Sequence, residues 1–294
     1  MTGASGVTEV GTGRLRFGYG TNGFANHRLD DALAVLADLG YQGVALTLDH
    51  GHLDPFEAGL AHRTAAVRRR LESLGLAVVV ETGARYLLDP WQKHAPTLLH
   101  DDHARRIDFL TRAVQIGADL GAEAVSFWAG VRPATVAPDL AWDRLVAGCA
   151  EVVAVADRAG VPLGFEPEPG MLVESIADWR RLRDALGAPP AFGITLDIGH
   201  CRCLEPLPVP DCVTAVAEHL VNVQIDDMRR GVHEHLEFGT GEIDFPPVLR
   251  ALADAGYRGL VAVELPRHSH DAPGVATRSL EFLRAAATAG RESR

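Results

Sequence analysis

The chain has 294 residues, of which 47% are hydrophobic and 23% are charged, so its composition is that of a globular protein with a large core. Its 28 basic and 39 acidic residues give a net charge of −11, and the resulting field repels phosphate backbones and anionic membranes. We therefore expect no nucleic-acid partner and no membrane partner, and we leave a homo-oligomer open.

The expected location follows from three features of the sequence. None of its apolar runs approaches the roughly 20 residues that cross a bilayer. Residues 1–13 are rich in Gly and Thr and do not follow the basic and then apolar pattern of a secretion signal. The 4 cysteines are too few for the disulfide framework of a small secreted domain. Together these features predict a cytoplasmic protein.

Short apolar runs rich in β-branched residues alternate with longer amphipathic stretches along the chain. Apolar runs of this length suit strands that are buried on both faces. The runs expected to form strands are 16–20, 43–48, 77–81, 123–128, 161–166, 192–197, 220–225 and 259–264. The stretches with helical spacing are 30–39, 62–74, 105–120, 140–159, 175–186 and 246–255.

Several of these helical stretches are followed by a glycine just before the next strand, namely Gly40, Gly75, Gly121, Gly160 and Gly256. Glycine readily takes the left-handed conformation that ends a helix, so each of these positions predicts a helix stop.

Repeated strand–helix units predict parallel strands, because each helix supplies the crossover that parallel neighbours need. We expect a single (β/α)8 TIM barrel over residues 16–288, preceded by a flexible segment, residues 1–15. The alternative is an open doubly wound sheet, but its G-x-G-x-x-G phosphate motif does not follow the first strand. No linker or change in composition marks a second domain.

Four of the later strands carry a polar side chain at or near their carboxyl ends, where barrel enzymes assemble their active sites. These residues are Glu166, Asp197, Gln224 and Glu264. Three converging carboxylates repel one another and are costly to bury unless a cation lies between them. We therefore predict one divalent cation. Oxygen ligands favour Mn²⁺ or Mg²⁺, with Co²⁺ or Zn²⁺ as alternatives.

Further polar residues are expected around this cluster. His200 follows the sixth strand, and the loop after the seventh strand carries His233 and His235 ahead of the glycine pair Gly239 and Gly241. An imidazole at this place can bind a substrate hydroxyl or orient a ligand.

The ends of the third and fourth strands add Glu81, Arg85 and Trp128, which we expect to bound a pocket with an aromatic wall and one ion pair. Two other motifs carry less weight. The pair His50 and His52 is expected at the surface or behind the site. The run 200–203, His-Cys-Arg-Cys, lacks the second cysteine pair of a zinc site and is expected to form a packed loop.

The segments GFEPEPG, TLDIGH, NVQIDDMRRGVHEHLEFGTGEIDF and GLVAVELP resemble the second half of the xylose-isomerase-like barrel superfamily. That group includes ketose 3-epimerases, hydroxypyruvate isomerases, inosose isomerases and dehydratases, dehydroshikimate dehydratases and a branch of apurinic-site nucleases. The resemblance is strongest over residues 161–266. It implies the metal ligands Glu166, Asp197, Gln224 and Glu264, with Gln224 closer to the hydroxypyruvate isomerase pattern than the histidine of the epimerases.

The resemblance also implies roles for residues near the ligands. His200 corresponds to a histidine that contacts a substrate hydroxyl, and His235 matches a substrate-side histidine less firmly. Epimerases usually carry a second glutamate where this chain has Leu172, while Glu168 lies two residues after Glu166. We therefore expect His200, His235, Glu168, Trp128 and Glu81 to face the substrate.

The activity implied by the resemblance is proton transfer at a carbon next to a carbonyl group of a sugar, keto-sugar or cyclitol. The cation would stabilise the enediolate, and Glu166 and Glu264 would act from opposite sides as base and acid. Return of the proton to the same carbon gives an epimerase, and return to the adjacent carbon gives an isomerase.

Three alternatives stay open at this point. The first is a dehydratase, in which the same enediolate of a ketocyclitol or a dehydroshikimate-like substrate expels a hydroxyl group. The second is a zinc phosphodiesterase of the apurinic-site nuclease type, because His200 and His235 match two of its extra ligands. The charge of −11 and Gln224 argue against it. The third is a non-catalytic sugar-binding barrel.

Overall fold

The computed structural model describes residues 15–83 and 85–292. Within these ranges, parallel strands close into a barrel in the order β1-β10-β7-β6-β5-β4-β3-β2. The barrel strands are β1 (Arg16–Gly20), β2 (Gly43–Thr47), β3 (Ala77–Glu81), β4 (Val125–Phe127), β5 (Leu163–Phe165), β6 (Phe192–Asp197), β7 (Leu220–Ile225) and β10 (Leu260–Val263). The single (β/α)8 TIM barrel is thereby confirmed, and the alternative of an open sheet is wrong.

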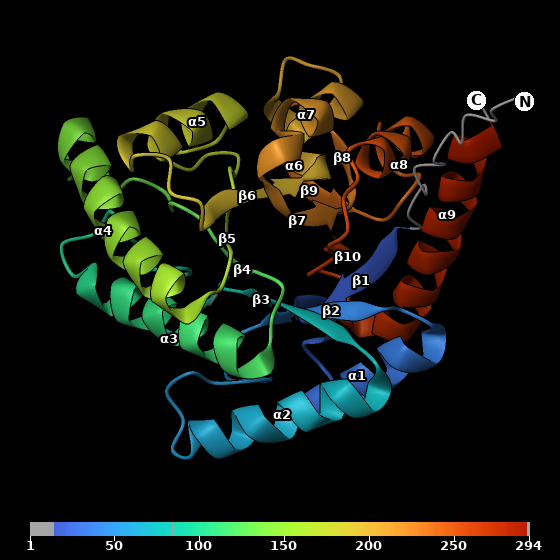
Figure 1. The fold of residues 1–294 in the computed structure, drawn as a ribbon, viewed down its shortest axis with the longest axis horizontal. Coiled ribbons are helices and arrows are strands. Elements are labelled where there is room, and N and C mark those ends of the chain that lie inside the picture. The colour runs from blue at the N-terminus through green and yellow to red at the C-terminus, as the bar shows by residue number, and fades with distance from the viewer. Residues whose placement is uncertain (1–14, 84, 293–294) are drawn as a thin grey trace, which may run out of the picture.

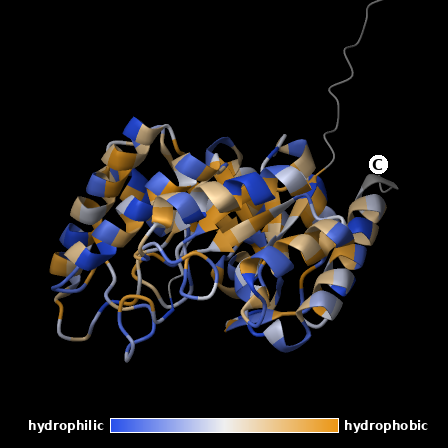
Figure 2. Ribbon diagram, turned by 90° about the horizontal axis from the view of Figure 1, so that it is seen from below, coloured by the Kyte–Doolittle hydropathy of each residue, from blue (hydrophilic) through white to orange (hydrophobic). Residues whose placement is uncertain are grey.

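Helices surround the barrel strands, as Figure 1 shows. They are α1 (Leu29–Leu39), α2 (Leu60–Leu74), α3 (Ala104–Leu120), α4 (Pro138–Ala159), α5 (Ile176–Ala185), α6 (Ile198–Leu204), α7 (Val209–Val216), α8 (Phe245–Asp254) and α9 (Ala272–Glu292). The hydrophobic residues concentrate on the strands and on the inward helix faces, whereas hydrophilic residues lie on the outer faces (Figure 2). The core therefore lies between the barrel and its helices, as burial of apolar surface requires.

The glycine stops predicted from the sequence are confirmed. Gly40, Gly75, Gly121, Gly160 and Gly256 have φ angles between 66° and 92°, the left-handed region that favours glycine. The first four are the C-cap residues of α1, α2, α3 and α4. Gly256 follows Ala255, the C-cap of α8.

The barrel interior contains a layer of buried polar side chains below the strand ends. Ser126 and Thr195 share a hydrogen bond of 2.9 Å between their hydroxyl oxygens, and the Asn222 amide donates to Glu81 Oε1 at 3.2 Å. Gly164 leaves room for this layer, because a Cβ atom there would lie 2.2 Å from Thr195 Oγ1. The layer satisfies polar groups that burial would otherwise leave without partners.

Two segments differ from the sequence prediction. Residues 200–203 were expected in a packed loop, but they belong to helix α6, which starts because the Asp197 side chain accepts a hydrogen bond from the His200 backbone N–H at 2.8 Å. The loop after β7 contains an antiparallel hairpin, β8 (Asp227–Arg229) and β9 (Val232–Leu236). Both segments carry residues of the candidate site.

Two further expectations concern the flexible N-terminal segment and a membrane partner. Residues 1–14 of the segment expected to be flexible lie outside the described residues, so the division at residues 15 and 16 stays a prediction. Across 15–83 and 85–292, no helix is both long enough and apolar enough to pass through a bilayer.

Candidate active site

A cavity of about 460 Å³ opens at the carboxyl ends of the barrel strands. Of the site residues predicted from the sequence, those that line it are Glu81, Trp128, Glu166, Glu168, His200, Gln224, His235 and Glu264. The remaining one, Asp197, is buried beside the cavity, and its carboxylate lies within 4.8 Å of ligand atoms of Glu166 and His200. The structure therefore brings all of these residues to one mouth, as predicted for a barrel enzyme.

The strand ends place acidic groups in close proximity. Glu166 and Asp197 are buried, and Glu264 is half-buried. Burial, followed by the charge of Glu264, raises the pKa of Glu166 well above its usual value. Burial also raises the pKa of Glu264, and Asp197 adds to that effect. Such shifts mean that the deprotonated cluster is unfavourable on its own and would be stabilised by a cation.

Two buried oxygen atoms of the residues at these strand ends have no hydrogen-bond donor among the described residues. These atoms are Oδ2 of Asp197 and Oε1 of Gln224, both buried. The strand register places Asp197 beside Gln224 on adjacent strands β6 and β7. Because buried polar atoms are nearly always paired, these two oxygens fit the ligands of a divalent cation.

Glu264 and Glu81 each have an amide partner. Asn22, in the short helix Thr21–Phe24 after β1, donates to Glu264 Oε1 at 3.0 Å. Glu81 accepts from Asn222, and burial together with the charge of Glu264 raises its pKa well above the usual value. The ion pair expected for Arg85 stays a prediction. Its guanidinium donates to the Pro266 carbonyl oxygen at 3.4 Å, and its charge lowers the pKa of the Glu264 carboxyl group.

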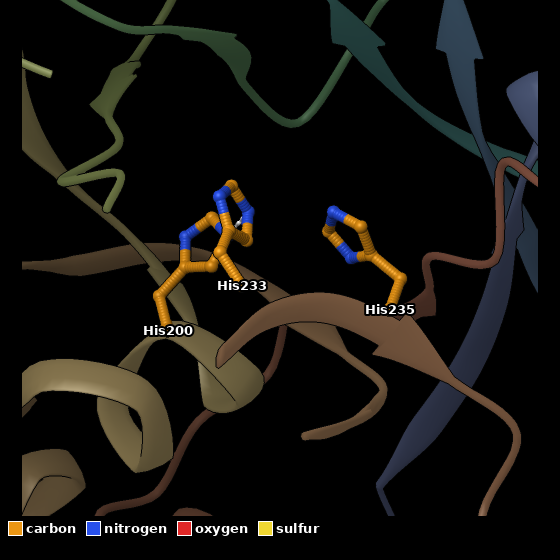
Figure 3. Close-up of side chains that lie close together, drawn as sticks. All are labelled: His200, His233 and His235. Carbon is orange, nitrogen blue, oxygen red and sulfur yellow. Dashed lines mark hydrogen bonds between the residues drawn. The ribbon is translucent and has the colours of Figure 1, made fainter. Parts of the chain in front are cut away.

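Three histidines gather on one side of the cavity (Figure 3). His200 comes from α6, whereas His233 and His235 project from β9, and one ligand nitrogen from each lies within 4.8 Å of the others. Nδ1 of His200 donates to the Pro167 carbonyl oxygen at 3.2 Å, which leaves its Nε2 as the acceptor for His233 Nε2 at 3.1 Å. Burial lowers the pKa of His200 to about 4, so this ring is neutral.

The third histidine of this group pairs with a carboxylate. His235 Nδ1 lies 2.5 Å from Oδ2 of Asp226, a residue with no exposed surface. Burial lowers the pKa of His235, but the charge of Asp226 and the hydrogen bond to it outweigh burial and raise the pKa to about 10. The pair fixes the ring so that its Nε2 edge is free for a ligand in the cavity.

The glycine pair Gly239 and Gly241 after β9 lies against the Asp227 carboxylate. Asp227 accepts hydrogen bonds from the backbone N–H groups of Gly239 at 2.9 Å, Gly241 at 2.8 Å and Ile243 at 3.1 Å. Gly239 has a φ of 83°, but Gly241 is required for space, because a Cβ atom there would lie 2.2 Å from Asp227 Oδ1. This turn holds β9 and its two histidines over the cavity.

The family model of the xylose isomerase-like TIM barrel matches residues 33–286, which is most of the chain. The chain belongs to the xylose isomerase-like TIM barrel family. The resemblance noted in the sequence is thereby confirmed.

Several relatives of this chain are sugar epimerases. Over 239 residues the chain is 26% identical to the L-ribulose-5-phosphate 3-epimerase of Salmonella typhi, covering 80% of this chain and 81% of the relative. Similar solved structures include an L-ribulose 3-epimerase, with a TM-score of 0.77, 21% identity and coverage of 95% of this chain and 97% of that one. A 3-keto-D-glucoside 4-epimerase from E. coli has a TM-score of 0.75 at 17% identity and covers 92% of this chain and 100% of that chain. At these identities the structures show the shared fold.

Several residues of the cavity were not found from the sequence. They are Asn22, Thr47, Tyr86, Lys93, His94, Pro266 and Arg267. Asn22 lies two residues after the end of β1. A polar residue just after a strand end is the same signal that predicts Glu166 and Glu264. Lys93 and His94 lie far beyond a strand end, in a long connection whose path the sequence pattern does not define.

Proposed function

We propose that this protein is a divalent-metal-dependent epimerase or isomerase that acts on a keto-sugar by proton transfer next to the carbonyl group. The observation that supports this proposal most is the convergence of Glu166, Asp197, Gln224 and Glu264 at one cavity, with unpaired buried oxygens on two of them. The family and its epimerase relatives support the same class of activity.

These four residues would hold the cation through carboxylate and amide oxygens, the ligand types that Mn²⁺ and Mg²⁺ prefer. A bound cation supplies a Lewis acid that stabilises negative charge on the substrate oxygens. Asn22 holds the Glu264 carboxylate from one side. The Asp197 side chain is fixed by the His200 backbone N–H, so its second oxygen stays free.

The two glutamates would perform the proton transfer. One carboxylate removes the proton from the carbon beside the carbonyl, and the electron pair moves onto the carbonyl oxygen to form an enediolate. The other glutamate, carrying a proton, returns one to the opposite face and restores the ketone with inverted configuration. Glu166 follows β5 and Glu264 follows β10, and both line the cavity, so each carboxyl group can reach a bound substrate from its own strand end.

Other residues would position the substrate and exclude water. His200 and His235 present imidazole nitrogens to the cavity and would bind substrate hydroxyls. Trp128, 9% exposed, forms part of the apolar wall, and Glu168 and Glu81 complete the polar lining. A mostly preformed pocket with a few polar groups is typical of a small-molecule site.

The proposal is tested with the purified chain and a panel of ketopentoses and ketohexoses. After treatment with EDTA, the protein should convert none of them, and addition of Mn²⁺ or Mg²⁺ should restore the formation of one epimer or isomer. Products are resolved by chromatography. Equal turnover before and after removal of the metal would show that proton transfer does not depend on a cation.

One observation favours a second candidate, a zinc-dependent phosphodiesterase. The histidines His200, His233 and His235 offer three nitrogen ligands within 4.8 Å, in addition to the oxygen cluster. The net charge of −11 and the amide of Gln224 argue against it. Elemental analysis separates the two candidates, since one metal ion per chain supports the epimerase and three zinc ions per chain support the phosphodiesterase.

A further inference from the structure

One wall of the cavity is positively charged. The cations Arg85 and Lys93 and the uncharged imidazole of His94 line it from the connection between β3 and α3, and Arg267 lines it from the loop after β10. The remainder of the cavity is acidic, and the whole chain carries a net charge of −11. Positive residues gathered on one side of an acidic cavity create a local field that favours an anion.

Arg85 and Lys93, the two cations of this connection, act on carboxyl groups of the cavity through their charge. Arg85 lowers the pKa of Glu264, and Lys93 lowers the pKa of Glu168. Among the described residues, Arg85 donates only to the Pro266 carbonyl oxygen, at 3.4 Å, and neither Arg85 nor Lys93 forms a salt bridge. Arg267 differs, because it pairs with Glu234 at 3.3 Å. Arg85 and Lys93 can therefore bind an anionic ligand without breaking a salt bridge.

A buried arginine supports this wall from behind. Arg106 is 3% exposed and donates to the carbonyl oxygens of Pro96 at 2.9 Å and His94 at 2.7 Å, so it fixes the connection. Its guanidinium carbon lies 4.9 Å from the ring centroid of Trp128, on the cavity wall. Burial lowers its pKa to about 9, which still leaves the side chain charged at neutral pH.

The conformation of His94 is also unusual. It has a φ of 68°, a left-handed conformation that is strained for a residue other than glycine, and its ring lies 5.2 Å from that of Trp128. Burial, followed by the charges of Lys93, Arg106 and Arg85, lowers the pKa of His94 to about 4. No acidic residue is among these causes, so the charges that act on this ring are all positive.

We propose that the cationic wall, formed by Arg85, Lys93 and His94 and supported by Arg106, binds an anionic group on the substrate. That group is a phosphate or a carboxylate at the end of the sugar remote from the carbonyl. The inference rests on the proposed function. Because the carboxylate cluster repels an anion and the wall attracts it, the charge separation orients the substrate with its carbonyl group toward Glu166 and Glu264.

The first experiment measures binding by isothermal titration calorimetry, with the full chain in the presence of Mn²⁺. The probes are a neutral ketopentose, its 5-phosphate and a ketohexose that carries a carboxylate at carbon 6. We expect at least one anionic sugar to bind about 10-fold or more tightly than the neutral one, since a charge-assisted hydrogen bond contributes at least that factor. The phosphate and carboxylate arms identify which anion the wall binds.

The second experiment uses the variants Lys93→Met and Arg85→Met, which keep the aliphatic part of each side chain. Each should reduce the preference for the anionic sugar over the neutral sugar by about 10-fold. Arg68→Met is the control, because it removes the same charge from a residue that lies on α2, away from the cavity. Arg68 pairs with Glu72 at 2.9 Å. The control should keep the preference of the native protein.

The outcomes separate this inference from the proposed function. Equal affinity for all three sugars, or a preference unchanged in both variants, would overturn the anion site, even if the protein epimerises the neutral sugar. Tighter binding of an anionic sugar that is lost in the variants supports the anion site, even if no sugar is converted. In that case only the proposed reaction would be wrong.

Discussion

The imidazole of His235 is held by the buried carboxylate of Asp226, with 2.5 Å between Nδ1 and Oδ2. The next residue, Asp227, has a different structural role. Its carboxylate accepts three backbone hydrogen bonds from the turn after β9. Two adjacent aspartates thus support the same part of the site, one through a side chain and the other through the backbone.

This division predicts different effects for two neighbouring variants. Asp226→Asn should lower kcat/KM by about 10-fold or more, because His235 loses the partner that orients it. It should lower the melting temperature less than Asp227→Asn does, because Asp226 contacts one side chain, whereas Asp227 accepts three backbone N–H groups of the turn.

Asp227→Asn should instead lower the free energy of unfolding by about 1–3 kcal/mol, because the carboxylate that accepts three N–H groups is lost. Thermal denaturation and steady-state kinetics on both variants check the pair of predictions. Similar loss of stability in both variants would contradict the separate roles.

A second prediction concerns pH and His94. An unfolded histidine has a pKa near 6.5, whereas burial and nearby cations lower that of His94 to about 4 in the fold. As the pH falls from about 6.5 toward 4, the unfolded chain binds a proton that the folded protein does not, so the free energy of unfolding decreases. Above about pH 6.5 this residue has no such effect.

His94→Asn removes this group, and asparagine tolerates the left-handed backbone at this position. The decrease in melting temperature between about pH 7 and about pH 5 should therefore be smaller in the variant than in the native protein. The measurement is made in buffer without phosphate, since a bound anion would stabilise the charged imidazole. Parallel curves for the two proteins would show that His94 titrates normally.

A third prediction concerns the buried arginine of the wall. Arg106→Met should lower the free energy of unfolding by about 1–3 kcal/mol, because the carbonyl oxygens of Pro96 and His94 lose their donor. Urea denaturation measures the change, and Arg68→Met serves as the exposed control. If the two variants are equally stable, Arg106 does not hold the connection.

A fourth prediction tests the cation through stability. Mn²⁺ at about 100 times its dissociation constant should stabilise the native protein by about 2.7 kcal/mol, because only the folded chain presents the ligands together. Asp197→Asn should reduce this gain while keeping the start of α6, since asparagine also caps helices. His50→Asn is the control, because His50 is exposed and pairs with Asp54. An equal gain in Asp197→Asn would place the ion elsewhere.

The sequence was sufficient to predict the barrel because its signals are local and repeated. The apolar runs 77–81, 192–197 and 220–225 match β3, β6 and β7 at both ends. The polar residues that end β5, β6 and β10 could be placed together because the carboxyl ends of barrel strands meet at one face.

Other features depend on contacts that the sequence pattern does not contain. Helix α6 has 7 residues, and its His-Cys-Arg-Cys run shows no clear helical spacing, so the sequence alone predicts a loop there. Asp226 and Asp227 are identical in type and adjacent, and only the packing distinguishes their roles. The cationic wall comes from the connection between β3 and α3, where Arg106 donates to the His94 carbonyl oxygen across a turn that no sequence pattern predicts.

The most direct test of the central claim is the incorporation of deuterium from D₂O into a ketose substrate by the Mn²⁺-loaded protein. Proton transfer between Glu166 and Glu264 predicts one deuterium at the carbon next to the carbonyl, detected by NMR, and its loss in Glu166→Gln and in Glu264→Gln. A ketose converted without deuterium at that carbon, or deuterium incorporation at the native rate in either variant, would contradict the account.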